Sequence, residues 1–183
     1  MKKLVVILML LPFLAVANIR LPAVIASNMV LQQKSTVKLW GWCSPSERIV
    51  ITPSWSNKTD TVYGTRDANW KISIQTPAAG GPYTITLKGN NTIVLENVMI
   101  GEVWVCSGQS NMQWSYWNKL KDIADELPTA ANPNIRFFHV TQATSDHPQD
   151  DCLAKWTECD SNTLKSFSAV GYFFGKRLNK ELN

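Results

Sequence analysis

The hydrophobic pattern of the chain changes near Met99, and this change separates two regions that must fold differently. Before it, short apolar or alternating runs recur between turn-forming segments; the runs are residues 37–42, 48–52, 70–74, 83–87 and 93–95. In residues 70–75 apolar and polar side chains alternate, which is the period of a strand with one buried face. Several short strands separated by turns predict a β-sandwich domain over residues 18–98.

The sequence after this change indicates an incomplete α/β domain over residues 99–183. Residues 99–106 form a continuous apolar run, typical of a strand buried on both faces in a parallel sheet. A small, polar turn follows at residues 107–112, and then a helix-compatible segment that Pro128 ends. We expect a second strand at 135–140, a polar loop at 141–151, and a last helix from about Asn162 to Leu182. Alternation of strands and helices predicts an α/β layer structure.

The last helix has a predicted start and a predicted buried face. Its N-cap is expected at Asp160, Ser161 or Asn162. Apolar residues at helical spacing form one stripe, which is expected to face the core: Leu164, Phe167, Val170, Phe174 and Leu178.

Residues 1–17 have the pattern of a secretory signal peptide. Two lysines precede an apolar run from Leu4 to Val16, and Ala15 and Ala17 provide small residues at the two positions that a signal peptidase reads. The run is shorter than the roughly 20 residues that span a bilayer, although an uncleaved N-terminal anchor is the alternative. We therefore expect a secreted or periplasmic protein that starts near Asn18, with no membrane partner after cleavage. The net charge of +4 is spread over scattered residues, which gives no support for nucleic acid as a partner.

Four cysteines and two histidines limit the redox and metal chemistry. In an oxidising compartment, Cys152 and Cys159 are close enough in sequence to close a small disulfide loop, although spacing alone does not decide this. Cys106 lies in an apolar run and is expected to be a buried free thiol. The cysteine spacing matches no zinc site, so no metal is predicted.

The turn Gly108-Gln109-Ser110-Asn111 is the strongest chemical signal. A serine between the end of a buried strand and a helix projects its hydroxyl at the sheet edge, where open α/β sheets bind ligands. Backbone N–H groups of the helix start can then hold a developing oxyanion. Glycine does not follow the serine, so this is not the Gly-x-Ser-x-Gly elbow of α/β-hydrolases. From spacing alone, serine and asparagine at a helix start are most often N-caps.

Residues 101–114 resemble the first conserved block of sialate O-acetylesterases, which belong to the SGNH hydrolase superfamily. Further segments are similar to the same family in the same order: 21–22, 28–33, 37–42, 135–138, 148–151, Trp156 and 167–175. The resemblance covers essentially the whole chain after residue 17. It implies a β-sandwich followed by the first part of an SGNH-type α/β hydrolase domain, with no metal or organic cofactor.

The resemblance implies hydrolysis of O-acetyl esters on sialic acid or a related sugar or glycan. Ser110 would attack the ester carbonyl, a histidine would act as base, and water would release acetate from the acetyl-enzyme. The family's later blocks, which carry the other oxyanion donors and the histidine, are absent from this sequence. We therefore expect a C-terminally truncated chain with little or no activity of its own.

Neither histidine of the chain is assigned as the base. His139 lies in an apolar run and is expected to be packed and hydrogen-bonded, and His147 is expected to be an exposed loop residue. Two other functions remain open: a carbohydrate-binding β-sandwich with a vestigial esterase segment, and an enzyme for another ester, such as a xylan or pectin acetylesterase.

The tryptophans around the turn have more than one interpretation. Trp70 and Trp104 fit strand cores. Trp114 and Trp117 are expected either to line a sugar pocket or to pack at the domain junction, and packing is slightly favoured.

Overall fold

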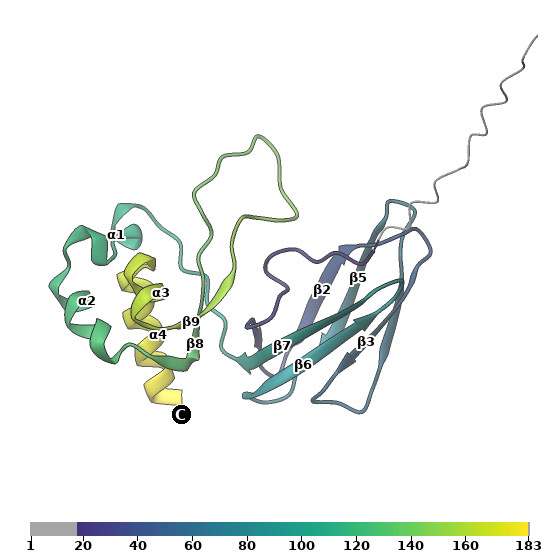
Figure 1. The fold of residues 1–183 in the computed structure, drawn as a ribbon, viewed down its shortest axis with the longest axis horizontal. Helices are drawn as coiled ribbons and strands as arrows, with labels where there is room; N and C mark the ends of the chain where they lie inside the picture. Colours follow the sequence, from purple (N-terminus) through teal and green to yellow (C-terminus); the bar gives the residue numbers. More distant parts are fainter. Residues whose placement is uncertain (1–17, 183) are drawn as a thin grey trace, which may run out of the picture.

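The computed structural model describes residues 18–182, which form a β region (residues 18–101) and a smaller α/β region (residues 102–182) side by side (Figure 1). The predicted signal peptide, residues 1–17, lies outside the described residues. The β region contains seven strands: β1 (Val30–Gln32), β2 (Thr36–Trp42), β3 (Arg48–Pro53), β4 (Asp60–Tyr63), β5 (Asn69–Gln75), β6 (Gly80–Lys88) and β7 (Thr92–Gly101). Among the described residues, no helix has the length and apolar character needed to cross a bilayer.

Two sheets make up the β region. One has the order β1-β7-β6-β3-β4 and is antiparallel except where β1 pairs with β7, and the other is the antiparallel pair β2-β5. Side chains from both sheets enter one buried cluster, with Leu39 and Ile74 from the pair and Ile51, Leu87 and Val98 from the larger sheet. The five strands predicted from apolar runs correspond to β2, β3, β5, β6 and β7, and β1 lies in the segment 28–33 that resembles the family's opening β segment. Strand β4 was not predicted.

Alternation along β5 shows why these residues form strands. Trp70 and Ile74 are buried, while Lys71, Ser73 and Gln75 face solvent, so the strand has one apolar face. The prediction that Trp70 occupies a strand core is confirmed, since it is 1% exposed. At the end of β2, a Cβ on Gly41 would lie 2.2 Å from the carbonyl oxygen of Arg20, so only glycine lets the N-terminal segment approach this closely.

The α/β region is built from short elements: helix α1 (Ser110–Gln113), a 3-10 turn (Tyr116–Asn118), α2 (Lys121–Glu126), a 3-10 turn (Leu127–Thr129), strands β8 (Asn132–Phe138) and β9 (Trp156–Cys159), and helices α3 (Ser161–Ser166) and α4 (Ala169–Leu182). Strands β8 and β9 pair antiparallel, and β9 was not predicted. A second buried cluster lies here; it includes Ile123, Phe137, Leu164 and Tyr172.

The predicted helix at 162–182 is two helices, because Phe167 is extended (φ −86°, ψ 161°). Its ring stacks on Phe137 with a centroid distance of 4.0 Å, and this contact holds the break. Asp160 is the N-cap of α3, since its Oδ1 accepts hydrogen bonds from the N–H groups of Asn162 and Thr163, each at 2.7 Å. The predicted apolar stripe is only partly buried, because Val170 and Phe174 are 49% and 41% exposed.

The predicted strand at 99–106 is wrong in its second half. Strand β7 ends at Gly101, so it crosses the predicted domain boundary between residues 98 and 99, and residues 102–109 are exposed and irregular. A strand needs a neighbour for its backbone groups, and among the described residues none pairs with 102–107. The prediction that Trp104 lies in a strand core is therefore also wrong, since Trp104 is 58% exposed.

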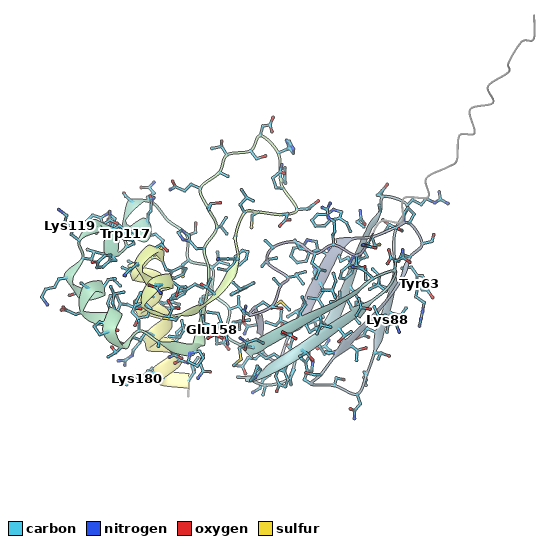
Figure 2. All side chains as sticks on the ribbon, in the orientation of Figure 1. Tyr63, Lys88, Trp117, Lys119, Glu158 and Lys180 are labelled. Atoms are coloured by element: carbon cyan, nitrogen blue, oxygen red, sulfur yellow. The ribbon has the colours of Figure 1, made fainter. Side chains whose placement is uncertain are left out.

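A polar network joins the two regions where Glu158 of β9 faces β7 (Figure 2). Arg136, whose side chain is 2% exposed, lies 3.0 Å through Nη1 from Glu158 Oε1, in an ion pair without hydrogen-bond alignment. Its Nη2 donates to Asn97 Oδ1 at 3.2 Å, and Asn97 Nδ2 donates to Glu158 Oε1 at 2.8 Å. Burial lowers the pKa of Arg136, and Glu158 opposes that shift.

All four cysteines are free thiols, so the possible disulfide between Cys152 and Cys159 is not formed. Cys159 is buried, and its Sγ donates to the carbonyl oxygen of Ala130 at 3.0 Å. Burial raises the pKa of Cys159 to about 11. The prediction that Cys106 is buried is wrong, because it lies in the exposed segment 102–109.

Candidate functional site

The candidate site is the turn that leads from the extended segment 102–109 into α1. Gln109 has extended backbone (φ −105°, ψ −152°) and precedes the first helical residue, Ser110. The Gln109 carbonyl oxygen accepts a hydrogen bond from the Met112 N–H at 2.9 Å, and the Ser110 carbonyl accepts one from the Trp114 N–H at 3.2 Å. Ser110 is exposed, and its hydroxyl has no hydrogen-bond partner among the described residues. The side chain predicted to be the nucleophile is therefore accessible.

The other residues of the predicted motif shape this turn. A Cβ on Gly108 would lie 3.0 Å from Met112 Cβ, so a larger residue would press against α1. Gln109 and Asn111 are exposed and hold no partner through their side chains among residues 18–182. The helix starts without a side-chain cap, so the interpretation of Ser110 or Asn111 as a plain N-cap is not supported. By helix geometry, the first N–H groups of α1 have no acceptor within the helix.

Helix α4 holds the turn in place. The Ala169 N–H donates to the Trp114 carbonyl oxygen at 2.8 Å, and Ser168 Oγ lies 3.3 Å from Met112 Sδ. Gly171 faces Cys106, since a Cβ there would lie 3.5 Å from the Cys106 Sγ. These contacts bring together the two segments that carry most of the sequence resemblance, 101–114 and 167–175.

The Trp104 ring attaches segment 102–109 to α4 at a second point, Phe174. It meets Phe174 edge to face, with centroids 5.2 Å apart. Together with the Cys106 contact one turn earlier on α4, this contact lays segment 102–109 along the helix. Ser168 and Ala169, which anchor the turn, were not predicted as site residues, although the resemblance at 167–175 was a signal for them.

Neither histidine completes a catalytic pair with Ser110. His139 follows the end of β8 and is exposed, with its ring edge-on to Phe167 at 6.1 Å, so the prediction of a packed, hydrogen-bonded histidine is wrong. His147 lies in the exposed loop, as predicted, and its Nδ1 is 2.6 Å from Asp146 Oδ1. Within residues 18–182, no group of three or more metal-ligating side chains converges.

Of the two tryptophans just past Ser110, Trp117 lies away from the junction of the two regions. Trp117 is 68% exposed, projects at the outer end of the α/β region beside Lys119 (Figure 2), and has Tyr116 as its ring contact. Trp114 is 46% exposed. For Trp117, the favoured interpretation, packing at the domain junction, is therefore wrong.

Two hollows lie away from Ser110. One, of about 420 Å³, is lined by Asp122, Asp125, Glu126 and Phe173. Its Glu126 is already engaged by Lys176 and by the Tyr172 hydroxyl, and these two contacts lower the pKa of Glu126.

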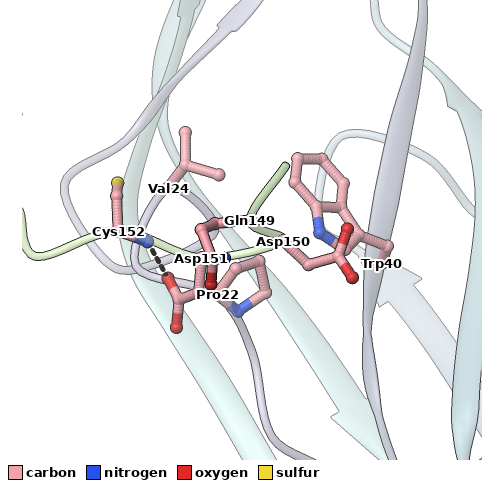
Figure 3. A pocket seen from close by; sticks show the side chains of 7 residues that line it. All are labelled: Pro22, Val24, Trp40, Gln149, Asp150, Asp151 and Cys152. Atoms are coloured by element: carbon pink, nitrogen blue, oxygen red, sulfur yellow. Dashed lines mark hydrogen bonds between the residues drawn. The ribbon is translucent and has the colours of Figure 1, made fainter. Parts of the chain in front are cut away.

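The other hollow, of about 200 Å³, lies between the β region and the loop 139–155 (Figure 3). Trp40 is the aromatic member of its lining, and sequence analysis did not identify it as a site residue. The resemblance at 37–42 and 148–151, two segments that meet in this hollow, was the signal that pointed to it.

Comparison with known proteins relates the chain to acetylesterases. No family model matches the sequence. The sialate O-acetylesterases of Homo sapiens and Pongo abelii are each 28% identical over 177 residues, and that of Rattus norvegicus is 30% identical over 181 residues. Each alignment covers 87% of this chain but only 33% or 34% of the relative. The chain thus spans about a third of the length of the curated relatives it matches.

A solved structure extends the likeness to the fold. A carbohydrate acetylesterase from Xanthomonas citri superposes with a TM-score of 0.84 at 31% sequence identity, covering 90% of this chain and 38% of that chain. Sequence and fold agree over nearly all the described residues. The chain is therefore a homologue of sialate O-acetylesterases and of this bacterial carbohydrate acetylesterase, and it matches only part of the length of either protein.

Proposed function

We propose that the chain is the nucleophile-bearing part of a carboxylic ester hydrolase that removes O-acetyl groups from sialic acid or a related sugar. The observation that carries this proposal is the exposed Ser110 hydroxyl, unpartnered among the described residues and held at a helix start against α4. In the reaction, Ser110 Oγ attacks the ester carbonyl, a base takes its proton, and the sugar hydroxyl leaves. Water then releases acetate and restores the serine.

The proposal also assigns an architecture to each region. The β region is a β-sandwich, and residues 102–182 are the first part of an SGNH-type domain of an exported enzyme. Segment 102–107 becomes a strand of that domain when neighbouring strands pair with it. The apolar side chains of Val103 and Val105, which are 40% and 91% exposed, support this part of the proposal, because a buried strand requires such residues.

Residues 1–183 alone are proposed to have little or no esterase activity. A serine hydroxyl is a weak nucleophile at neutral pH without an adjacent base. His139 and His147 contact Phe167 and Asp146 rather than Ser110. The proposed reaction therefore needs a base and further oxyanion donors that the described residues do not supply.

A chimera tests the role of Ser110. Residues 18–183 replace the matching part of the Xanthomonas citri enzyme, and acetate release is measured on 4-methylumbelliferyl acetate, O-acetylated sialic acid and acetylated xylan. We expect activity in the chimera that Ser110→Ala lowers by about 10⁴-fold or more. The matched control is Ser107→Ala, which changes an exposed serine of the same segment and leaves most of the activity.

Three outcomes would contradict the proposal. Equal activity of the Ser110→Ala chimera would show that this serine is not the nucleophile. A cooperatively folded but inactive chimera would show that the turn does not supply a working nucleophile, and so would favour a vestigial site. Robust hydrolysis by the isolated 183-residue chain, lost on Ser110→Ala, would contradict the need for an external base.

A further inference from the structure

The hollow between the β region and the loop 139–155 combines an aromatic wall with a polar wall (Figure 3). Pro22 and Val24 of the N-terminal segment and Trp40 of β2 form the first wall, and residues 149–152 of the loop form the second. Its volume of about 200 Å³ is below that of pockets for drug-sized ligands, so it has room for one monosaccharide unit at most. The walls come from the two regions of the molecule, so the hollow exists only while they are docked.

Polar groups of this hollow are left without protein partners. Among the described residues, no hydrogen bond or ion pair engages the Asp150 carboxylate or the Trp40 indole N–H, and the Gln149 amide uses only its nitrogen, on Ser145 and His147. A carboxylate accepts hydrogen bonds from neighbouring hydroxyls, an indole N–H donates one, and an apolar ring face packs on the C–H face of a sugar. This is the set of groups that a pyranose ring uses.

The polar wall is fixed in place before any ligand arrives. Asp151 Oδ1 accepts hydrogen bonds from the N–H groups of Ala23 and Cys152, each at 2.8 Å. Just after the loop, the Trp156 indole N–H donates to the Val24 carbonyl oxygen at 2.8 Å. Thr141 closes the base of the loop by donating through Oγ1 to the Leu153 carbonyl oxygen at 2.9 Å. A preformed wall lowers the ordering cost of binding.

Charge distinguishes between the sugars that this hollow can accept. Among residues 18–182, its only ionisable side chains besides the Cys152 thiol are the carboxylates of Asp150 and Asp151, and no basic side chain from this part of the chain lines it. Like charges at close range oppose binding, so an acidic sugar such as sialic acid is disfavoured and a neutral sugar is favoured. We propose that this hollow is a subsite for a neutral sugar unit of a glycan, bound against Trp40 and hydrogen-bonded to Asp150.

The biological role of this subsite rests on the proposed esterase function. The subsite adds to that function a binding place for a neutral sugar, separate from Ser110. The test uses binding alone, so that it stands apart from catalysis. A chain of residues 18–183 that carries Ser110→Ala is titrated with xylotriose, cellotriose, mannotriose, lactose and 3′-sialyllactose. Binding is followed by calorimetry and by tryptophan fluorescence.

We expect millimolar dissociation constants, which correspond to about −4 kcal/mol, for at least one neutral trisaccharide. Trp40→Ala should weaken this binding by about tenfold, and Asp150→Asn by about threefold. Matched controls are Asp146→Asn, on the same loop with a side chain 93% exposed, and Trp117→Ala, which is 68% exposed; both should bind as the parent does. Lactose should bind more tightly than 3′-sialyllactose, which differs from it by the acidic sugar.

Absence of saturable binding by every neutral sugar in the set would overturn the subsite. Equal weakening by Asp146→Asn and Asp150→Asn would also overturn it, because the loss would then reflect loop charge in general. Tighter binding of 3′-sialyllactose than of lactose would overturn the assignment of a neutral sugar. Because Trp40 also packs against the β core, the surface variant Asp150→Asn keeps the test decisive if Trp40→Ala unfolds. These binding measurements do not depend on catalysis, so an inactive chimera in the Ser110 experiment would not change their interpretation.

Discussion

The β region and the α/β region differ in how completely they bury their own apolar side chains. In the β region, one cluster draws on both sheets, and many of its side chains are less than 2% exposed. Apart from Tyr63 and Val94, all exposed large apolar side chains among the described residues follow Gly101. The first region closes its core by itself, whereas the second presents apolar faces on segment 102–109 and α4.

Truncation of one buried leucine in each region should give the largest difference in the free energy of unfolding. Leu39 in β2 and Leu164 in α3 are both 0% exposed. We expect Leu39→Ala to lower the free energy of unfolding by about 4 kcal/mol and Leu164→Ala by about 2.5 kcal/mol, because the smaller cluster relaxes more readily around the cavity. Urea unfolding followed by far-UV circular dichroism checks both values.

The control for this pair is Val94→Ala, at a residue 48% exposed on β7. It should change the free energy of unfolding by less than about 0.5 kcal/mol. A loss for Leu164→Ala equal to or above that for Leu39→Ala would show that the two clusters are equally well closed, and the comparison would fail.

The network between the regions is expected to have a smaller effect. Glu158→Gln keeps an acceptor for Asn97 but leaves Arg136, which is 2% exposed, without its anion. We expect a loss of about 1–2 kcal/mol, below the value for a fully buried pair because the Glu158 side chain is 45% exposed. The loss should appear as separation of the unfolding transitions of the two regions, seen by far-UV and near-UV circular dichroism.

An exposed ion pair provides the matched control for Glu158→Gln. Arg177 and Glu181 lie one helical turn apart on α4 with side chains 72% and 54% exposed. Glu181→Gln should change the free energy of unfolding by less than about 0.5 kcal/mol. If Glu158→Gln has as little effect as this control, the network does not couple the regions.

The cap of α3 should give the smallest effect and one that depends on pH. The Thr163 N–H, with support from Asn162, holds the pKa of Asp160 below its ordinary value. Since the folded-state pKa is the lower one, this stabilisation is full above the ordinary pKa of about 3.9 and disappears as the pH falls through the folded-state pKa. Asp160→Ala should cost about 1 kcal/mol at pH 7 and progressively less below about pH 4.

Unfolding by urea from pH 7 down to pH 3 measures this dependence. Asp160→Asn, which retains a capping oxygen without a titrating charge, should lie between wild type and Asp160→Ala at pH 7. A difference between wild type and Asp160→Ala that stays constant across this pH range would show that the ionised form contributes nothing to the cap.

The local signals in the sequence predicted much of the backbone. Short apolar or alternating runs between turn residues located β2, β3, β5, β6 and β7, because each strand places side chains in the core. Asp160 was among the predicted caps because its carboxylate satisfies backbone N–H groups within three residues. Strands β4 and β9 were not predicted, since each is four residues long and too short to show a period.

The sequence by itself determined a small, polar turn before a helix at residues 107–112. The resemblance of residues 101–114 to sialate O-acetylesterases identified Ser110 as the candidate nucleophile, because spacing alone favours an N-cap there. Only the tertiary structure decided that Trp104 and Cys106 are exposed, that His139 faces Phe167 and that Trp40 meets the loop 139–155. The physical reason is that periodicity reports the local backbone and the side that favours burial. Whether that side is covered depends on segments distant in the sequence, which only the folded chain brings into contact.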